Sequence, residues 1–251
     1  MISNLLPNPA AIFAKGTPMA TKIRLRNARA AFVEVGAPDY YQGKKQRDSE
    51  KRAWSVAFIC SKDTEALGPD GVWGPAKQVI DKAIAAEAGA KWGPKAASNL
   101  ASILSDPKAC CLTNGDRKPD YAGYPGNWIL AAKRTEDKGR PLVFDKTKQC
   151  VYPTKDQWYT DGDGTQRKYE SDSNTPCLGM AGKIYSGCYV AATVSIWAQA
   201  AGTGFGAGMR CELVGVQVTR DGDAFGGGMP ASSAADDFDD ISQGADAGSL
   251  A

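Results

Sequence analysis

The 251-residue sequence contains no histidine. Histidine is the commonest general base and metal ligand, so its absence excludes Ser-His-Asp and Cys-His mechanisms. The seven cysteines form no Cys-x-x-Cys pair, and their odd number argues against a disulfide framework and a zinc finger. We therefore expect a non-enzymatic protein with no metal or other cofactor, in a reducing compartment, whose cysteines are mostly small core residues.

Long hydrophobic runs are also missing. No apolar stretch approaches the roughly 20 residues that a membrane-spanning helix needs. Residues 1–18 lack the basic start, apolar core and small-residue cleavage site of a secretion signal. We therefore expect no membrane partner and treat residues 1–19 as a flexible N-terminal arm, with Met19 as an alternative start to Met1.

Positive charge is absent from the C-terminal end. The segment up to Arg220 holds all 30 Lys and Arg residues and 21 of the 28 Asp and Glu residues, a net charge of +9, whereas the remainder holds seven Asp, a net charge of −7. A basic body indicates a polyanionic partner, and an acidic tail indicates an interaction segment or a mimic of that polyanion. Solubility alone is the alternative explanation for both features.

Two long strands are predicted between residues 185 and 220. In Tyr185–Trp197 the apolar residues alternate with aromatic and hydroxyl residues, which is typical of a strand with one core face and one open face. The core face consists of Cys188, Val190, Ala192, Val194 and Ile196, and the open face of Tyr185, Tyr189, Thr193, Ser195 and Trp197. A glycine loop, 202–208, leads to the second strand, Arg210–Arg220; it lacks the Gly-Lys-Ser/Thr ending of a nucleotide-binding loop.

Earlier in the chain we expect three more strands and two helices. The strands are Lys22–Arg26, Ala53–Cys60 and Leu142–Phe144. The helices begin after Gly74-Pro75 and Gly93-Pro94, the first with a possible end at Gly89. The polar segment 155–174 reads as a long loop, and its Asp-Gly-Asp-Gly run fails the calcium-loop pattern.

Cations cluster in two N-terminal segments, and the second of these also contains tyrosines. In Lys22–Arg26 three cations share one strand face, which suits phosphate binding or protection of a sheet edge. The loop 37–52 interleaves tyrosines with cations, which suits base stacking combined with backbone contacts; a solvated loop is the alternative.

An ordered series of short motifs resembles a family of bacteriophage single-stranded-DNA-binding proteins, formerly a domain of unknown function and similar to the T7-type phage protein. The series is Ala181-Gly182-x-x-Tyr185-x-Gly187, Gly215-Val216-Gln217, Asp221-Gly222-Asp223, Gly226-Gly227 and the acidic end. The resemblance implies a mostly β chain: an OB-fold, five-stranded Greek-key barrel over residues 20–225 with inserted helices, and a disordered acidic tail over 226–251. It also implies the cytoplasm of the bacterial host.

The resemblance adds Tyr121, Tyr124, Trp128, Lys133 and Arg134 as groove residues. The full set of expected DNA-binding residues is Lys22, Arg24, Arg26, Tyr40, Tyr41, Lys44, Lys45, Arg47, Tyr121, Tyr124, Trp128, Lys133, Arg134, Arg140, Tyr185, Tyr189 and Trp197. The expected protein-binding motif of the tail is Asp236, Asp237, Phe238, Asp239 and Asp240. The family's terminal aromatic residue is replaced here by Ser249-Leu-Ala251.

We thus expect a largely sequence-independent single-stranded-DNA-binding protein that protects and organises DNA in phage or prophage replication and recombination. A replicative polymerase or helicase is the expected partner of the tail, and a homodimer stays open. Two alternatives remain: a metal-dependent nuclease, which would need clustered carboxylates in a folded site, and a non-catalytic phage structural or interaction protein.

Overall fold

The structure is a computed structural model of the whole chain. It describes residues 20–225, except for 41–42, 46–49, 154, 156–157, 161–163, 171–172, 174–175, 177–183 and 203–205. The expected N-terminal arm, the acidic tail, Cys177, Tyr41 and Arg47 therefore lie outside the described residues.

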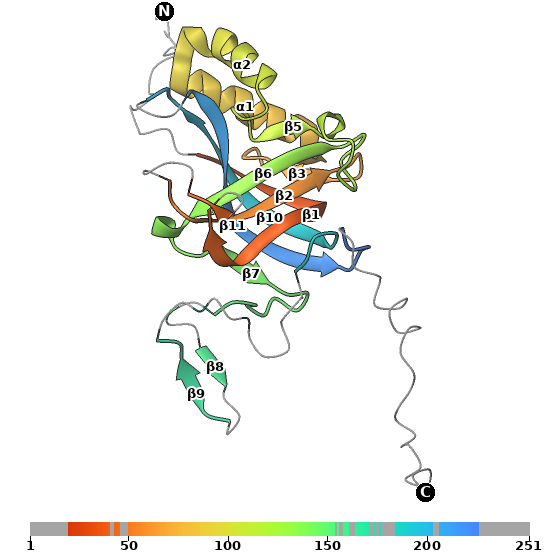
Figure 1. Cartoon of the computed structure of the whole chain (residues 1–251), viewed down its shortest axis with the longest axis vertical. Coiled ribbons are helices and arrows are strands. Elements are labelled where there is room, and N and C mark those ends of the chain that lie inside the picture. Colours follow the sequence, from red (N-terminus) through yellow and green to blue (C-terminus); the bar gives the residue numbers. More distant parts are fainter. Residues whose placement is uncertain are drawn as a thin grey trace, which may run out of the picture.

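Five long strands form a closed barrel, as predicted (Figure 1). They are β1 (Thr21–Asp39), β2 (Ala53–Cys60), β6 (Trp128–Thr135), β10 (Tyr189–Gln199) and β11 (Gly208–Arg220). Their order around the barrel is β1-β2-β6-β11-β10, and β10 pairs with β1 to close it. All neighbours are antiparallel except β6 and β11. This order and the single parallel contact are those of an OB-fold.

Strand β1 bends so that it belongs to both halves of the barrel. Its first half pairs with β10 and its second half with β2. Asn27 and Phe32 adopt positive φ angles of 59° and 48°, and the strand register shifts beside each of them. Extra residues of this kind bend a strand and redirect side chains. One strand can therefore supply residues to two different outer faces.

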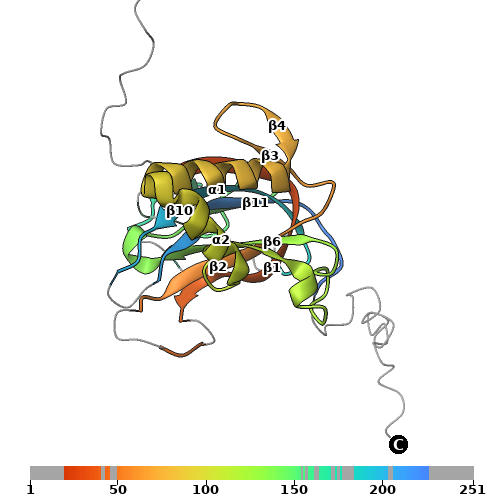
Figure 2. The same ribbon diagram turned by 90° about the horizontal axis from the view of Figure 1, so that it is seen from above.

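Two insertions interrupt the barrel strands. Between β2 and β6 lie β3 (Glu65–Leu67), β4 (Trp73–Pro75), α1 (Ala76–Trp92), α2 (Ala96–Ser105), β5 (Leu112–Asn114) and 3₁₀ turns at Gly93–Lys95 and Gly115–Arg117. Between β6 and β10 lie a 3₁₀ turn at Glu136–Lys138, β7 (Leu142–Phe144), β8 (Trp158–Thr160) and β9 (Gln166–Lys168). Helix α1 lies across one end of the barrel (Figure 2), whereas the β8–β9 hairpin projects beyond β7 (Figure 1).

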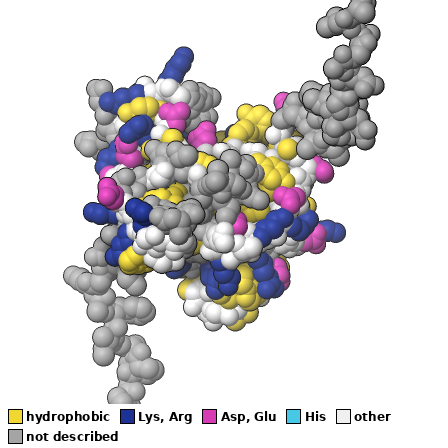
Figure 3. All heavy atoms as spheres, turned by 90° about the horizontal axis from the view of Figure 1, so that it is seen from below, with side chains coloured by type: hydrophobic (Ala, Val, Ile, Leu, Met, Phe, Trp, Pro, Cys, Tyr) yellow, Lys and Arg dark blue, Asp and Glu magenta, His cyan; other side chains and the backbone are white. Residues whose placement is uncertain are grey.

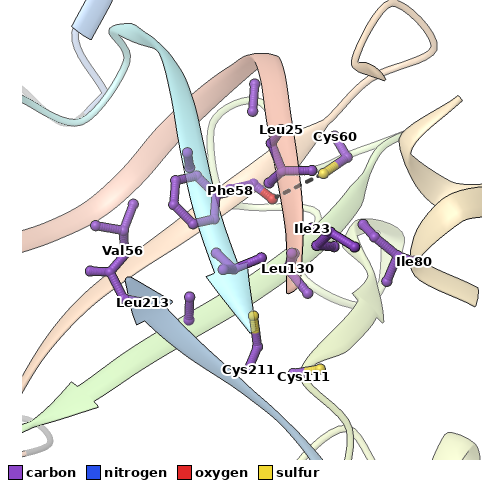
Figure 4. Packing of buried hydrophobic residues seen from close by; sticks show 14 of the residues in the cluster. Ile23, Leu25, Val56, Phe58, Cys60, Ile80, Cys111, Leu130, Cys211 and Leu213 are labelled. Atoms are coloured by element: carbon purple, nitrogen blue, oxygen red, sulfur yellow. Dashed lines mark hydrogen bonds between the residues drawn. The ribbon is translucent and has the colours of Figure 1, made fainter. Parts of the chain in front are cut away.

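The core fills the barrel and continues beneath α1. Ile23 and Leu25 of β1, Phe58 of β2, Leu130 of β6 and Ile80 of α1 are fully buried together (Figure 4). The predicted core face of the strand at 185–197 is buried at all five positions. The six described cysteines are buried too, and burial raises the pKa of Cys60 to about 12. Such thiols are packing residues rather than nucleophiles.

Four predicted elements differ from the structure. Strand β10 begins at Tyr189 and not at Tyr185, because a turn at residues 186–187 precedes it. Strand β1 is far longer than Lys22–Arg26 because the bend hides its alternation. Helix α1 continues through Gly89 and ends at Trp92, where Gly93 at φ 52° provides the cap. The segment 155–174, predicted as loop, contains the β8–β9 hairpin. In the described part of the chain no helix has both the length and the apolar character needed to cross a membrane.

Candidate nucleic-acid interface

A groove of about 570 Å³ runs over the outer face of β1, β2 and β6. Its floor is made of short side chains such as Ser55, Ala57 and Ala131. One wall is the loop before β6, which contributes Lys118, Tyr121 and Tyr124. We call this depression the aromatic groove. It lies on the half of the barrel that receives the second part of β1.

Three aromatic rings meet at one end of the aromatic groove. The Phe32 ring lies 5.3 Å from that of Tyr121 and 6.1 Å from that of Tyr124, and the two tyrosine rings are 5.4 Å apart. Phe32 is 53% exposed and Tyr121 is 42% exposed. Exposed rings held by their neighbours can stack on bases with little loss of side-chain freedom.

Tyr124 supports this cluster from below. It is 5% exposed and packs with Ala31, Ile59 and Ile129 in a small hydrophobic cluster on the outer face of the sheet. Burial, followed by the nearby Tyr121, raises the pKa of the Tyr124 phenol to about 12. The loop comes this close because Gly115 lacks a Cβ, which would lie 2.0 Å from the Tyr124 carbonyl oxygen.

Charge in the aromatic groove is balanced. Its lining residues include three cations and three carboxylates, namely Lys51, Lys118, Lys133, Glu34, Asp39 and Glu50. Lys51 also forms an ion pair with Asp137, with 2.7 Å between the Nζ and Oδ2 atoms. The Lys118 Nζ atom lies 5.1 Å from the Tyr121 ring centroid, so positive charge sits next to the exposed rings.

A second groove, of about 420 Å³, lies on the other half of the barrel over β1, β10, β11 and β7. Lys22, Arg24 and Arg26 line it from β1, and Thr193 and Gln217 line it from β10 and β11. Arg26 forms an ion pair with Glu65 and lies over the Trp73 ring, with 4.2 Å between its Cζ atom and the ring centroid. We call this depression the basic groove.

Sequence comparison identifies the family. The profile described as the single-stranded-DNA-binding protein of Enterobacter phage Enc34 matches residues 21–248. The chain belongs to this family. The Enc34 family consists of phage single-stranded-DNA-binding proteins and not of enzymes. This confirms the predicted family and the prediction of a non-enzymatic protein. A relative named protein p50, from Acyrthosiphon pisum secondary endosymbiont phage 1, is 34% identical over 222 residues, which cover 88% of this chain and 94% of that protein.

Solved structures of the Enc34 protein share the fold. The Enc34 protein in complex with single-stranded DNA aligns with a TM-score of 0.55 at 18% identity, over 87% of this chain and 100% of that chain. The same protein without DNA in its description aligns with a TM-score of 0.53 at 19% identity, over 88% and 97%. The T7 protein gp2.5 aligns with a TM-score of 0.41 at 17% identity, over 88% and 97%.

The Enc34-family motifs around residues 185 and 222 close one end of the barrel. The Tyr185 hydroxyl donates to the Gly222 carbonyl at 3.0 Å and accepts from the Gly222 amide at 3.1 Å. At Gly187, with φ 115°, a Cβ would lie 2.1 Å from the Asp223 carbonyl oxygen. Tyr185, predicted to bind DNA, thus anchors the closing segment 221–225.

Tyr189, also predicted to stack on bases, is covered by arginines. The Arg220 Cζ atom lies 3.2 Å and the Arg29 Cζ atom 5.3 Å from its ring centroid. Arg29 also lies 4.3 Å from the Phe225 ring centroid, and Phe225 packs against the cluster that contains Tyr124. We call Arg29, Tyr189, Arg220 and Phe225 the arginine bridge.

Three other residues that we predicted to bind DNA contact other parts of the protein instead. Arg140 is 6% exposed and donates to the carbonyl oxygens of Val35, at 2.6 Å, and Gly36. Arg134 donates to Glu212 at 2.6 Å and to two loop carbonyls. Trp128 faces the core and α1, where Lys77 lies 4.2 Å from its ring. We leave these three residues out of the proposed interface.

The remaining predicted residues are scattered. Trp197 is half-buried on the outer face of β10, where it is paired in register with Arg210. Tyr40 directly follows β1, and Lys44 and Lys45 are exposed in the loop after it. None of these four lines either groove of the described chain. The tail residues Asp236, Asp237, Phe238, Asp239 and Asp240, like Tyr41 and Arg47, lie outside the described residues.

Sequence reasoning missed Phe32 and Lys118. Phe32 directly follows Ala30 and Ala31, and its ring is exposed at a position with a positive φ angle and a shift in strand register. Lys118 had a usable signal, a cation three residues before Tyr121.

On the face seen from below, Lys and Arg side chains lie interspersed with hydrophobic ones (Figure 3). Within the described ranges, no three Cys, Asp or Glu side chains gather in a way that could hold a metal ion.

Proposed function

We propose that the aromatic groove is where this protein of the Enc34 family holds single-stranded DNA. The observation that carries the proposal is the exposed ring pair Phe32 and Tyr121, supported by Tyr124 and flanked by Lys118 and Lys133. Unpaired bases can stack on these rings, and the two lysines can reach the adjoining phosphates. Stacking accepts every base, so binding is largely independent of sequence.

The proposed biological role follows from this mode of binding. A protein that covers unpaired bases would protect and organise single strands during phage or prophage replication and recombination. The acidic tail, through Asp236–Asp240, would recruit a replicative polymerase or helicase. The solved complex of the Enc34 protein with single-stranded DNA supports the binding on which this role depends.

The test compares ring removal inside and outside the aromatic groove. Phe32→Ala and Tyr121→Ala should each weaken oligo-dT binding by roughly 1–3 kcal/mol, because one stacking platform is lost. Tyr121→Phe keeps the ring and should bind nearly as the wild type does. Trp158→Ala, at a 60% exposed ring on the β8–β9 hairpin, is the matched control. Fluorescence anisotropy of labelled oligo-dT gives the affinities.

Two results would contradict the proposal. Wild-type affinity in both alanine variants would remove stacking from the aromatic groove. A lower unfolding temperature with a matching loss of binding would mean that the rings stabilise the fold and do not stack on bases. Thermal unfolding of the two alanine variants separates these cases, and Tyr121→Phe, which retains both packing and stacking, should bind and unfold nearly as the wild type does.

A further inference from the structure

The two grooves differ in charge although they lie on the same barrel. The aromatic groove has balanced lysines and carboxylates, whereas the described lining of the basic groove contains Lys22, Arg24 and Arg26 and no carboxylate. Phosphate neutralisation is the source of salt-dependent binding to nucleic acids. The aromatic groove can therefore supply stacking, but the larger electrostatic contribution must come from another surface.

Lys22 and Arg24 are arranged to meet an extended polyanion. They alternate with the buried Ile23 and Leu25, so both side chains point out of the barrel. Residues two apart on one strand face are separated by about 7 Å. This is comparable with the separation of neighbouring phosphates along an extended single strand. The strand register sets them opposite Ser195 and Thr193, whose short side chains leave the groove open.

The arginine bridge lies between the two grooves. Phe225 packs against the cluster that contains Tyr124, at the edge of the aromatic groove. Arg29 lies over both Phe225 and Tyr189, and Arg220 covers Tyr189. Tyr189 shares the outer face of β10 with Thr193 in the basic groove.

The bridge arginines also keep their charge available to DNA. Arg29 donates to the backbone carbonyls of Gly187, at 3.1 Å, and Asp223, at 2.7 Å. Arg220 donates to the Asn27 side-chain oxygen at 3.2 Å. These acceptors are neutral, so they fix the two guanidinium groups in place without cancelling their charge. The bridge is thus a positively charged crossing between the grooves.

We propose that one single strand occupies both grooves: its bases stack in the aromatic groove, and the strand then crosses the arginine bridge so that its phosphates follow the basic groove. This proposal rests on the proposed function, because it extends the same DNA beyond its first site. The alternative occupant of the basic groove, a second copy of this chain docked through the same face, would bring like charges together.

Oligonucleotide length distinguishes the two sites. OB-folds cover roughly 4–16 nucleotides, so an oligo-dT of about 6 nucleotides should fill the aromatic groove only and one of about 20 should reach both. The variant Lys22→Ala/Arg24→Ala should bind the short oligonucleotide as the wild type does. For the long one, its affinity should fall by about tenfold in ~0.05 M salt, and the salt slope should be smaller by about 1.4, or ~0.7 per lost contact.

The matched control is Lys82→Ala/Lys91→Ala, which removes two exposed cations of α1 that line neither groove. It should leave both affinities and the salt slope unchanged. Thermal unfolding of all variants should coincide, since the four substituted side chains are exposed. Fluorescence anisotropy across a salt series measures both quantities, and sedimentation velocity reports the oligomeric state.

Each contradicting result has a distinct meaning. Wild-type binding of the long oligonucleotide by Lys22→Ala/Arg24→Ala would overturn the second site while the proposed function stands. Equal weakening for both lengths would place all DNA in one site and also overturn it. A changed oligomeric state would make the basic groove an interface between copies. Failure of the wild type to bind either length would instead contradict the proposed function itself.

Discussion

Individual arginines of this protein have two kinds of surroundings. The Arg140 guanidinium is buried between the rings of Trp54 and Tyr152, with its Cζ atom 5.3 and 4.6 Å from their centroids. The Arg24 side chain, by contrast, is exposed in the basic groove. Sequence alone cannot separate these cases, because the surroundings of a side chain are created by segments far away in the chain.

Arg140 is expected to act on stability and not on binding. Arg140→Ala would remove the donors to the buried Val35 carbonyl and to the half-buried Gly36 carbonyl, which keeps the Trp54 Nε1 donor, so the free energy of unfolding should fall by about 2–4 kcal/mol. Arg140→Lys should also be destabilising, since one ammonium cannot reproduce the planar fork. Denaturant unfolding gives the stability, and oligo-dT anisotropy on folded protein gives the affinity. Unchanged stability together with weaker binding would mean that Arg140 contacts DNA, as the sequence predicted.

The closing segment 221–225 explains why the motifs around residues 187 and 222 contain glycine. Its backbone passes so close to residues 185–187 that neither Gly187 nor Gly222 has room for a side chain. The Phe225 amide donates to the Ser186 carbonyl at 2.8 Å and places the Phe225 ring beside Gly123. These close approaches therefore position Phe225, one member of the arginine bridge.

Gly187→Ala should destabilise this end of the barrel by about 3 kcal/mol or more, because the new Cβ clashes with backbone and φ 115° is strained for alanine. Gly202→Ala is the control, since its Cβ would meet no atom within 4 Å. Denaturant unfolding compares the two variants. Equal stability of Gly187→Ala and the wild type would mean that the segment 221–225 does not pack as described.

Strands with a continuous or alternating apolar pattern were predictable, and the bent one was not. Strand β2 has the predicted bounds Ala53–Cys60, and the buried face of β10 has the predicted residues. The structure also brings the predicted Tyr121, Tyr124 and Lys133 into one groove. Phe32 joins them through a positive φ angle in β1, a backbone feature that leaves no trace in the hydrophobic pattern.

Charge divides the whole molecule into a body of +9 up to Arg220 and a C-terminal remainder of −7. Glycines 226–228 follow the arginine bridge in the chain, so the acidic residues are tethered close to the proposed DNA path. A tethered segment has a high effective concentration at a nearby site. We therefore expect the tail to compete with DNA for the same cations.

Deleting residues 231–251 should raise the affinity for single-stranded DNA. The gain should be clearest below about 0.1 M salt, because higher salt screens the competition between the tail and DNA. A variant with Asn at 236, 237, 239 and 240 keeps the length and should reproduce the gain. The deletion should also abolish binding to a partner polymerase or helicase, and Phe238→Ala should remove part of it. Anisotropy at several salt concentrations is the measurement. An affinity unaffected by truncation at low salt would limit the tail to protein contacts or solubility.

The central claim is that exposed rings and outward-facing cations together select an unpaired strand. Its most direct test is a titration of full-length protein with labelled oligo-dT and with duplex DNA of equal length over a salt series. We predict tighter binding of oligo-dT than of duplex, since duplex bases cannot reach the rings, and an affinity for oligo-dT that falls steeply as salt rises. Equal affinity for the two forms, or an affinity insensitive to salt, would contradict the account.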